Sequence, residues 1–118
     1  MKVFVTGVGG QLGHDVVYEL CSRGHAAIGS DIHHDCGGFA DKKAPYVQLD
    51  ITDKEAVSRV IAQIKPDAVI HCAAWTAVDA AEDAENREKV DLINHLGTKN
   101  IAQAAKTVDA KMIYISTD

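Results

Sequence analysis

Residues 2–13, KVFVTGVGGQLG, carry the strongest structural signal in this chain. The opening KVFVT is rich in β-branched and aromatic residues and predicts a buried strand. Gly7, Gly10 and Gly13 follow it where a helix is predicted to open. At such a place the first glycine permits a sharp turn, the second the close approach of a pyrophosphate, and the third tight packing of helix on strand. The free amides at the helix start would meet the phosphate charge. The spacing therefore predicts a dinucleotide cradle, and a glycine turn used only for packing is the alternative.

The remaining segments alternate between strand and helix patterns. Strands are predicted over residues 2–6, 26–31, 46–49, 68–72 and 111–116, and helices over residues 11–23, 53–64 and 82–107. Residues 32–44 show no periodicity and are predicted to be a loop. Gly24 is expected to end the first helix, Asp53 to cap the second and Pro66 to stop it.

Strands that alternate with helices imply right-handed crossovers and a parallel sheet. We predict a doubly wound Rossmann-like α/β sheet of order 3-2-1-4-5, formed by residues 1–118 as one domain. Ligands of such sheets bind at the carboxyl edge near the switch point. Because the chain ends where the fifth strand would reach that edge, we expect it to be a fragment, truncated before any substrate domain.

The composition is that of a globular protein and excludes several classes. Of the 118 residues, 47% are hydrophobic and 25% charged, and no apolar run is long enough to cross a membrane. The net charge of −5 argues against nucleic acid or an anionic membrane as the partner. Three cysteines without metal-ligand or CxxC spacing, and the absence of a signal peptide, favour a reducing, cytoplasmic location.

Asp31 ends the second predicted strand, 18 residues after Gly13. A carboxylate there would accept hydrogen bonds from both ribose hydroxyls of the adenosine half and would repel a 2′-phosphate. No Arg follows to compensate that repulsion, although His33 and His34 could do so in part. The position therefore favours NADH over NADPH, with dual use open. A helix or turn cap is the alternative role of Asp31.

Further candidates follow the third and fourth strands. Asp50 can accept from an adenine amino group and Ile51 can cover the ring, unless Asp50 shares a capping role with Thr52 and Asp53. After the fourth strand, Ala73 and Ala74 are small enough for the backbone to approach the cofactor. Trp75, the only tryptophan, would form a wall beside the nicotinamide or the sugar, and packing of Trp75 under the next helix is the alternative.

Other polar residues lie in the fourth strand, in the long helix and at the end of the chain. His71 lies in an apolar strand and is interpreted as a core residue rather than a ligand. Asn94 either binds main-chain groups or water, or is simply exposed. A hydroxyl at the end of the fifth strand, in Ser116-Thr117-Asp118, is well placed to bind a substrate carbonyl or to tune a nearby acid, and a polar strand exit is the alternative. No metal site is assigned, because neighbouring loop residues such as His33 to Cys36 seldom complete a tetrahedral set.

These motifs together resemble the dTDP-4-dehydrorhamnose reductase family, a branch of the extended short-chain dehydrogenases. The resemblance covers the whole chain, and the combination of AAxTAVDxAE with STD is fairly specific to this family. It rests on TGxxGQLG at 6–13, Asp31, LDITD at 49–53, PDxVIHCAAxTAVDxAE at 66–82, NxxGTxNIAxAA at 94–105 and STD at 116–118.

The resemblance implies a role for each matching residue. Gly10, Gln11 and Leu12 would lie on the pyrophosphate, Asp31 on the adenosine ribose, Asp50 and Ile51 on the adenine, and Ala74, Trp75 and Thr76 beside the ribose and nicotinamide. Thr117 matches the catalytic-site Ser/Thr, and Asp118 would lie close to a sugar-nucleotide substrate. The family's Tyr-x-x-x-Lys pair would lie beyond Asp118, so this chain alone is expected to be inactive.

The implied reaction of the complete protein is NAD(P)H-dependent reduction of the 4-keto group of dTDP-4-dehydro-L-rhamnose, for cell-surface polysaccharide. Two alternatives stay open. One is a catalytically silent NAD(P)-binding subunit, because a regulatory subunit of methionine adenosyltransferase resembles these reductases. The other is a sugar-nucleotide epimerase or dehydratase, which TAVDxAE and STD disfavour. A homodimer also stays open.

Overall fold

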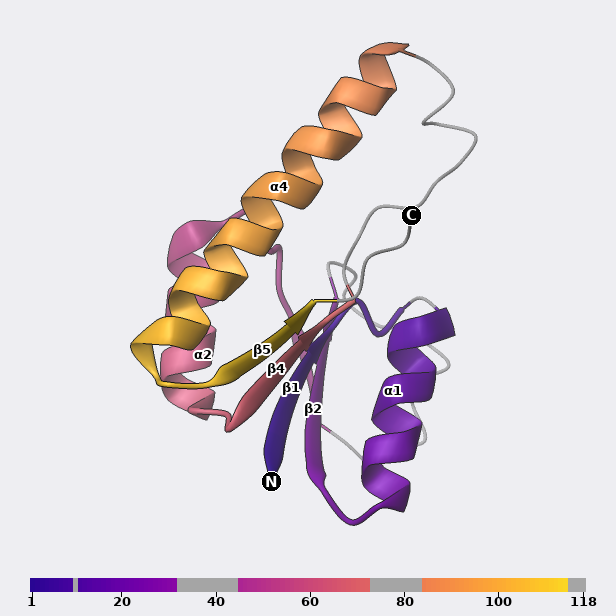
Figure 1. Cartoon of the computed structure of the whole chain (residues 1–118), viewed down its shortest axis with the longest axis vertical. Coiled ribbons are helices and arrows are strands. Elements are labelled where there is room, and N and C mark those ends of the chain that lie inside the picture. Colours follow the sequence, from indigo (N-terminus) through magenta and orange to yellow (C-terminus); the bar gives the residue numbers. More distant parts are fainter. Residues whose placement is uncertain (10, 32–44, 73–83, 115–118) are drawn as a thin grey trace.

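A five-stranded parallel sheet forms the centre of the molecule, with helices on both faces (Figure 1). The computed structural model describes residues 1–9, 11–31, 45–72 and 84–114, without the side chains of residues 11 and 84–93. The order β3-β2-β1-β4-β5 confirms the prediction. The elements are β1 (Lys2–Thr6), α1 (Gln11–Ser22), β2 (Ala26–Asp31), β3 (Tyr46–Gln48), α2 (Lys54–Ile64), β4 (Ala68–His71), α4 (Ala84–Thr107) and β5 (Lys111–Tyr114).

The central strand β1 has no solvent-facing side after its first residue, because each face of the sheet has its own core. Phe4 belongs to the cluster beneath α2 and α4, together with Val69, Ile61 and Ile101. Val5 belongs to the cluster beneath α1. This two-sided burial explains why β1 reads as a continuous apolar run instead of an alternating one.

Helix α2 begins after Asp53 and ends before Pro66, as the capping and stop signals in the sequence predict. The Asp53 carboxylate accepts from the backbone N–H of Ala56 at 3.2 Å and so caps the first turn. At the other end Lys65 adopts a left-handed conformation (φ 49°), and its N–H donates to the carbonyl of Ile61 at 2.8 Å. Pro66 then prevents continuation of the helix.

Helix α1 ends at Ser22, and Gly24 follows it in the predicted capping role, but the apolar face of the helix is shorter than the sequence spacing indicates. Gly24 has a φ of +84°, and its N–H donates to the carbonyl of Cys21 at 3.1 Å. Val17 is buried, whereas Leu12 is 43% exposed. Leu12 therefore lies on the helical stripe in sequence but not in the core.

The topological switch point lies between β1 and β4. Strands β2 and β3 are added on one side of β1, whereas β4 and β5 are added on the other, so the connections diverge at this pair. Thr6 and His71, the last residues of β1 and β4, are register partners. A crevice for ligands is expected above them, at the carboxyl ends of the strands.

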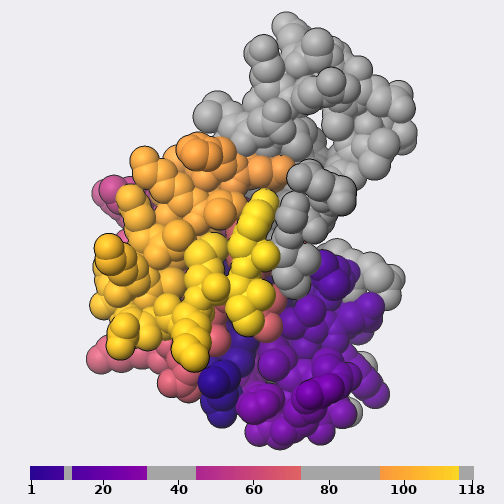
Figure 2. Space-filling model, viewed as in Figure 1, coloured from indigo at the N-terminus to yellow at the C-terminus, as the bar shows by residue number. Residues whose placement is uncertain are grey.

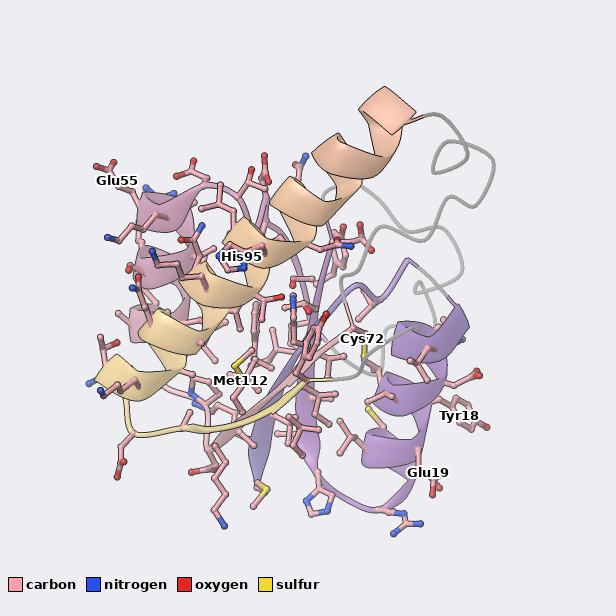
Figure 3. The ribbon with its side chains drawn as sticks, turned by 45° about the horizontal axis from the view of Figure 1, so that its top comes forward. Tyr18, Glu19, Glu55, Cys72, His95 and Met112 are labelled. Carbon is pink, nitrogen blue, oxygen red and sulfur yellow. The ribbon has the colours of Figure 1, made fainter. Side chains whose placement is uncertain are left out.

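Strand β5 forms one edge of the described sheet and is visible at the surface beside α4 in Figure 2. Met112 points from β5 into the core beneath α2 and α4 (Figure 3), whereas Ile113 is 53% exposed. Among the described residues, no helix has the length and apolar character needed to span a membrane.

Candidate dinucleotide-binding site

The glycine turn after β1 is fastened to the neighbouring strand. Gly7 has a φ of +75°, a conformation that side-chain-bearing residues rarely adopt, which confirms its predicted role in the sharp turn. The N–H groups of Gly7 and Val8 both donate to the carbonyl of Ser30 in β2, at 2.8 and 3.1 Å. The start of the turn is therefore held by backbone hydrogen bonds and not by side-chain packing alone.

Gly13 is required for space. A Cβ atom at this position would lie 2.7 Å from the carbonyl carbon of Gly7 and 2.9 Å from Cα of Val8. The close packing predicted for Gly13 is thus confirmed, and its contact is with the turn just after β1. Gly10 lies outside the described residues, Gln11 begins α1, and Leu12 is exposed in the first helical turn.

Asp31 makes a direct contact with the same turn. Its Oδ2 accepts a hydrogen bond from the N–H of Gly9 at 2.8 Å. The backbone of Asp31 is fixed in turn, since its carbonyl accepts from the N–H of Leu49 at 2.8 Å and from the Tyr46 hydroxyl at 3.2 Å. The turn-capping role left open by the sequence is therefore present, and it places a carboxylate beside the glycine turn.

Asp50 organises the turn that follows β3. Its Oδ1 accepts from both the N–H and the hydroxyl of Thr52, at 2.9 and 2.7 Å, while Asp53 separately caps α2. The capping alternative is thus observed for Asp50 in this structure. Asp50 is exposed, so its carboxylate also faces the solvent at the carboxyl edge of the sheet.

Helix α4 holds the adjacent Ile51 through two residues that sequence reasoning missed. The Asn100 side chain donates from Nδ2 to the carbonyl of Ile51 at 2.9 Å. A Cβ atom at Gly97 would lie 2.7 Å from Cγ1 of Ile51, so only glycine permits this approach. A glycine and an asparagine three residues apart in a predicted helix were the available signal, because neither residue type favours a helix interior.

The interpretation of His71 as a core residue is confirmed. Its side chain is 1% exposed, and Nδ1 lies 2.7 Å from the Thr6 hydroxyl. Nε2 lies 3.1 Å from the hydroxyl of Thr98 in α4. Burial lowers the pKa of His71 to about 4, so the imidazole is neutral near pH 7.

Several predicted site residues lie outside the described part of the chain. They are Gly10, Ala73, Ala74, Trp75, Thr76, Thr117 and Asp118. Asn94 is described and is half-buried on α4. Within the described ranges, no group of three or more His, Cys, Asp or Glu side chains is arranged to hold a metal ion.

The residues brought together at the switch point suit a dinucleotide. The first turn of α1 carries no acidic residue of its own, so the positive end of the helix is available to a phosphate. The contact between Gly13 and Gly7 keeps the turn free of side chains that would fill a cradle. Asp31 ends β2 and Asp50 follows the neighbouring strand β3, so both carboxylates are hydrogen-bond acceptors at the same sheet edge.

The whole chain matches a known family. The model described as the RmlD substrate binding domain matches residues 1–118. The dTDP-4-dehydrorhamnose reductase of Mycolicibacterium smegmatis is 36% identical over 99% of this chain and 30% of its own length. The methionine adenosyltransferase 2 subunit beta of Bos taurus is 31% identical over 99% of this chain and 32% of its own length. The chain thus spans about a third of these relatives.

Solved structures share the fold. The Bordetella bronchiseptica enzyme WbmH, in complex with NAD+, aligns with a TM-score of 0.74 and 31% identity, over 92% of this chain and 36% of that one. The UDP-glucose 4-epimerase of Thermus thermophilus, in complex with NAD, aligns with a TM-score of 0.78 and 30% identity, over 93% of this chain and 35% of that one.

Proposed function

The chain belongs to the RmlD substrate binding domain family, and from that premise we propose that it is the nicotinamide-dinucleotide-binding part of a sugar-nucleotide reductase. The observation that supports this most directly is the hydrogen bond from Gly9 to Asp31, which joins a glycine turn to a strand-end carboxylate beside the switch point. The structures of WbmH and of the Thermus epimerase with bound NAD support the choice of a nicotinamide cofactor.

For the whole protein we propose reduction of the 4-keto group of dTDP-4-dehydro-L-rhamnose to give dTDP-L-rhamnose. The relative from Mycolicibacterium smegmatis supports this substrate by its name. The bound nicotinamide would supply a hydride to the carbonyl carbon. A proton must reach the carbonyl oxygen, and the resemblance assigns that step to a Tyr-x-x-x-Lys pair beyond Asp118.

The residues of this chain would bind the cofactor and orient it relative to the substrate. Gly7, Gly10 and Gly13 would shape the turn, and the backbone at Gln11 and Leu12 would face the pyrophosphate at the start of α1. Asp50 and Ile51 would lie against the adenine. Ala73, Ala74, Trp75 and Thr76 would flank the ribose and nicotinamide, Thr117 would hydrogen-bond the substrate oxygen or the tyrosine, and Asp118 would lie near the sugar nucleotide.

Asp31 would set the cofactor preference. Its carboxylate would accept from the ribose hydroxyls and repel a 2′-phosphate, which favours NADH. Asp31 also supports the glycine turn, because its carboxylate accepts a hydrogen bond from Gly9. Asp31→Ala would therefore weaken the binding of both NADH and NADPH. The informative change is Asp31→Asn, which removes the charge while its amide oxygen can still accept from Gly9.

We expect Asp31→Asn to narrow the preference for NADH over NADPH by about tenfold, because hydrogen bonds to a charged group are worth roughly 1.5–3 kcal/mol. Titration calorimetry with each cofactor measures the ratio. Asp67→Asn is the matched control. Asp67 lies just before β4, at the edge of the sheet opposite the proposed site, and its carboxylate likewise accepts from a backbone N–H, that of Lys2. An unchanged ratio in Asp31→Asn would contradict the ribose contact.

The second candidate function is a catalytically silent NAD(P)-binding subunit, which the similarity to methionine adenosyltransferase 2 subunit beta supports. Cofactor binding is expected for both functions, so the two are distinguished by whether the protein oxidises NADH in the presence of substrate. In the whole protein, the reductase would oxidise NADH only when the 4-keto sugar nucleotide is added. A protein that binds NADH but never consumes it with this substrate would favour the silent subunit.

A further inference from the structure

The two strands that flank the switch point are joined by a buried side-chain hydrogen bond. Thr6 ends β1 and His71 ends β4, and the Thr6 hydroxyl lies 2.7 Å from Nδ1 of His71. Both side chains are essentially inaccessible to solvent. The bond therefore lies in the sheet directly beneath the expected ligand crevice.

The same imidazole also reaches the elements on either side. Nε2 of His71 lies 3.1 Å from the Thr98 hydroxyl, which comes from α4. The ring of Tyr114, the register partner of His71 at the end of β5, stacks on it with a centroid separation of 5.4 Å. One side chain thus connects the carboxyl ends of β1, β4 and β5 to the helix above them.

The hydrogen-bonding groups match a neutral imidazole. A neutral ring offers one donor and one acceptor, and each threonine hydroxyl can serve in either capacity. The Thr6 oxygen accepts in addition from the N–H of Cys72 at 3.1 Å. Burial, which disfavours the charged ring, agrees with this arrangement.

The two strand-end residues of this hydrogen-bonded set, Thr6 and His71, come just before segments of the proposed site. Thr6 precedes Gly7, whose left-handed conformation starts the glycine turn, and His71 and Cys72 precede residues 73–76. The Thr6–His71 hydrogen bond therefore fixes the separation of the last residues of β1 and β4, from which these two segments begin. Replacing a buried polar pair by apolar groups of the same shape is often nearly neutral for stability, so stability alone does not require the bridge.

We propose that the Thr6–His71–Thr98 bridge positions the glycine turn and the exit of β4 for dinucleotide binding. Thr6 and His71 act as positioning residues, which hold the two backbones at a fixed separation without touching the cofactor. This inference rests on the proposed function, since it assigns the bridge to that site.

Thr6→Val and Thr6→Ser test the bridge as a matched pair. Valine has the shape of threonine but no hydroxyl, whereas serine keeps the hydroxyl. The N–H of Cys72 keeps a partner in both variants, because it also lies 3.3 Å from the backbone carbonyl of Thr6. We expect Thr6→Val to weaken NADH binding about tenfold and Thr6→Ser to stay within about twofold of wild type.

The measurements are the NADH dissociation constant, taken well below the unfolding temperature, and the unfolding temperature itself. A lower unfolding temperature with unchanged NADH affinity in Thr6→Val would overturn the inference, because the bridge would then be merely structural. Should Thr6→Val fail to fold, Thr98→Val with Thr98→Ser as control tests the bridge from α4. Wild-type protein that does not bind NADH would overturn the proposed function and this inference together.

Discussion

Gly7 and Gly13 belong to one motif but are required for different physical reasons. Gly7 supplies a backbone conformation with φ +75°, whereas Gly13 supplies empty space against the backbone of Gly7 and Val8. The three glycines in the sequence do not by themselves show which position needs a positive φ and which needs the space. The distinction matters because a conformational requirement and a steric one respond differently to the addition of a single methyl group.

Gly13→Ala should therefore displace the start of α1 from the turn. The added Cβ would lie 2.7 Å from a backbone carbon that cannot rotate away, so we expect a loss of about 1–3 kcal/mol in stability and a clear loss of NADH affinity. Chemical denaturation and NADH titration measure the two effects.

Gly24→Ala is the control for Gly13→Ala. Gly24 has a positive φ, as Gly7 does, but a Cβ there meets nothing within 4 Å. This variant should lose about 1–2 kcal/mol through backbone strain while NADH affinity stays unchanged, because Gly24 follows the far end of α1. Equal NADH affinities for Gly13→Ala and wild type would show that the turn tolerates displacement.

At the scale of elements, α4 positions the turn that follows β3 as well as covering the sheet. Gly97 permits the close approach of Ile51, and Asn100 holds the carbonyl of Ile51. Both residues lie on the buried side of α4, the side that also carries Ile101 and Ala104. The long crossover helix therefore determines where Asp50 and Ile51 stand relative to the glycine turn.

Gly97→Ala tests the contact between Gly97 and Ile51, because the contact determines whether the substitution raises or lowers the stability of the protein. Alanine within a helix is usually more stable than glycine by about 1 kcal/mol. Here the new Cβ would lie 2.7 Å from Cγ1 of Ile51, a stiff β-branched side chain, so we expect destabilisation by about 1–2 kcal/mol. Urea denaturation of the variant gives the sign directly.

The double variant Gly97→Ala with Ile51→Ala is the companion measurement. In the Ile51→Ala background the obstructing atoms are gone, so Gly97→Ala should become stabilising, and the coupling between the sites should appear as non-additivity. Additive effects would contradict a direct contact between α4 and Ile51.

At the scale of the whole molecule, His71 connects β1, β5 and α4 to its own strand β4, and its protonation links folding to pH. The folded-state pKa of about 4 lies below the ordinary value of 6.5. Between these values the unfolded chain binds a proton that the folded protein does not, so the free energy of unfolding falls as the pH falls through that window.

The expected loss attributable to His71 is about 3 kcal/mol between pH 7 and pH 4. His71→Gln cannot titrate and serves as the comparison. The stability advantage of wild type over His71→Gln should shrink as the pH is lowered from 7 to 4, measured by denaturation at each pH. Parallel pH profiles for the two proteins would show that His71 does not carry this linkage.

Local chemistry determined much of this protein from its sequence. Strand β1, the Asp53 cap, the glycine C-cap of α1 and the sheet order were predictable, because each depends on residues close in sequence or on the right-handedness of crossovers. The resemblance of the whole chain to a reductase family was also present in its motifs. These features need no knowledge of which distant residues meet.

The contacts between residues far apart in the chain could be identified from the three-dimensional structure alone. Asp31 bonds Gly9 across 22 residues, Asn100 bonds Ile51 across 49, and Thr6 bonds His71 across 65. It also showed Leu12 exposed in spite of its helical spacing. Periodicity predicts which side of an element is apolar, but a hydrogen-bond partner depends on the register and packing of whole elements, which no local pattern encodes.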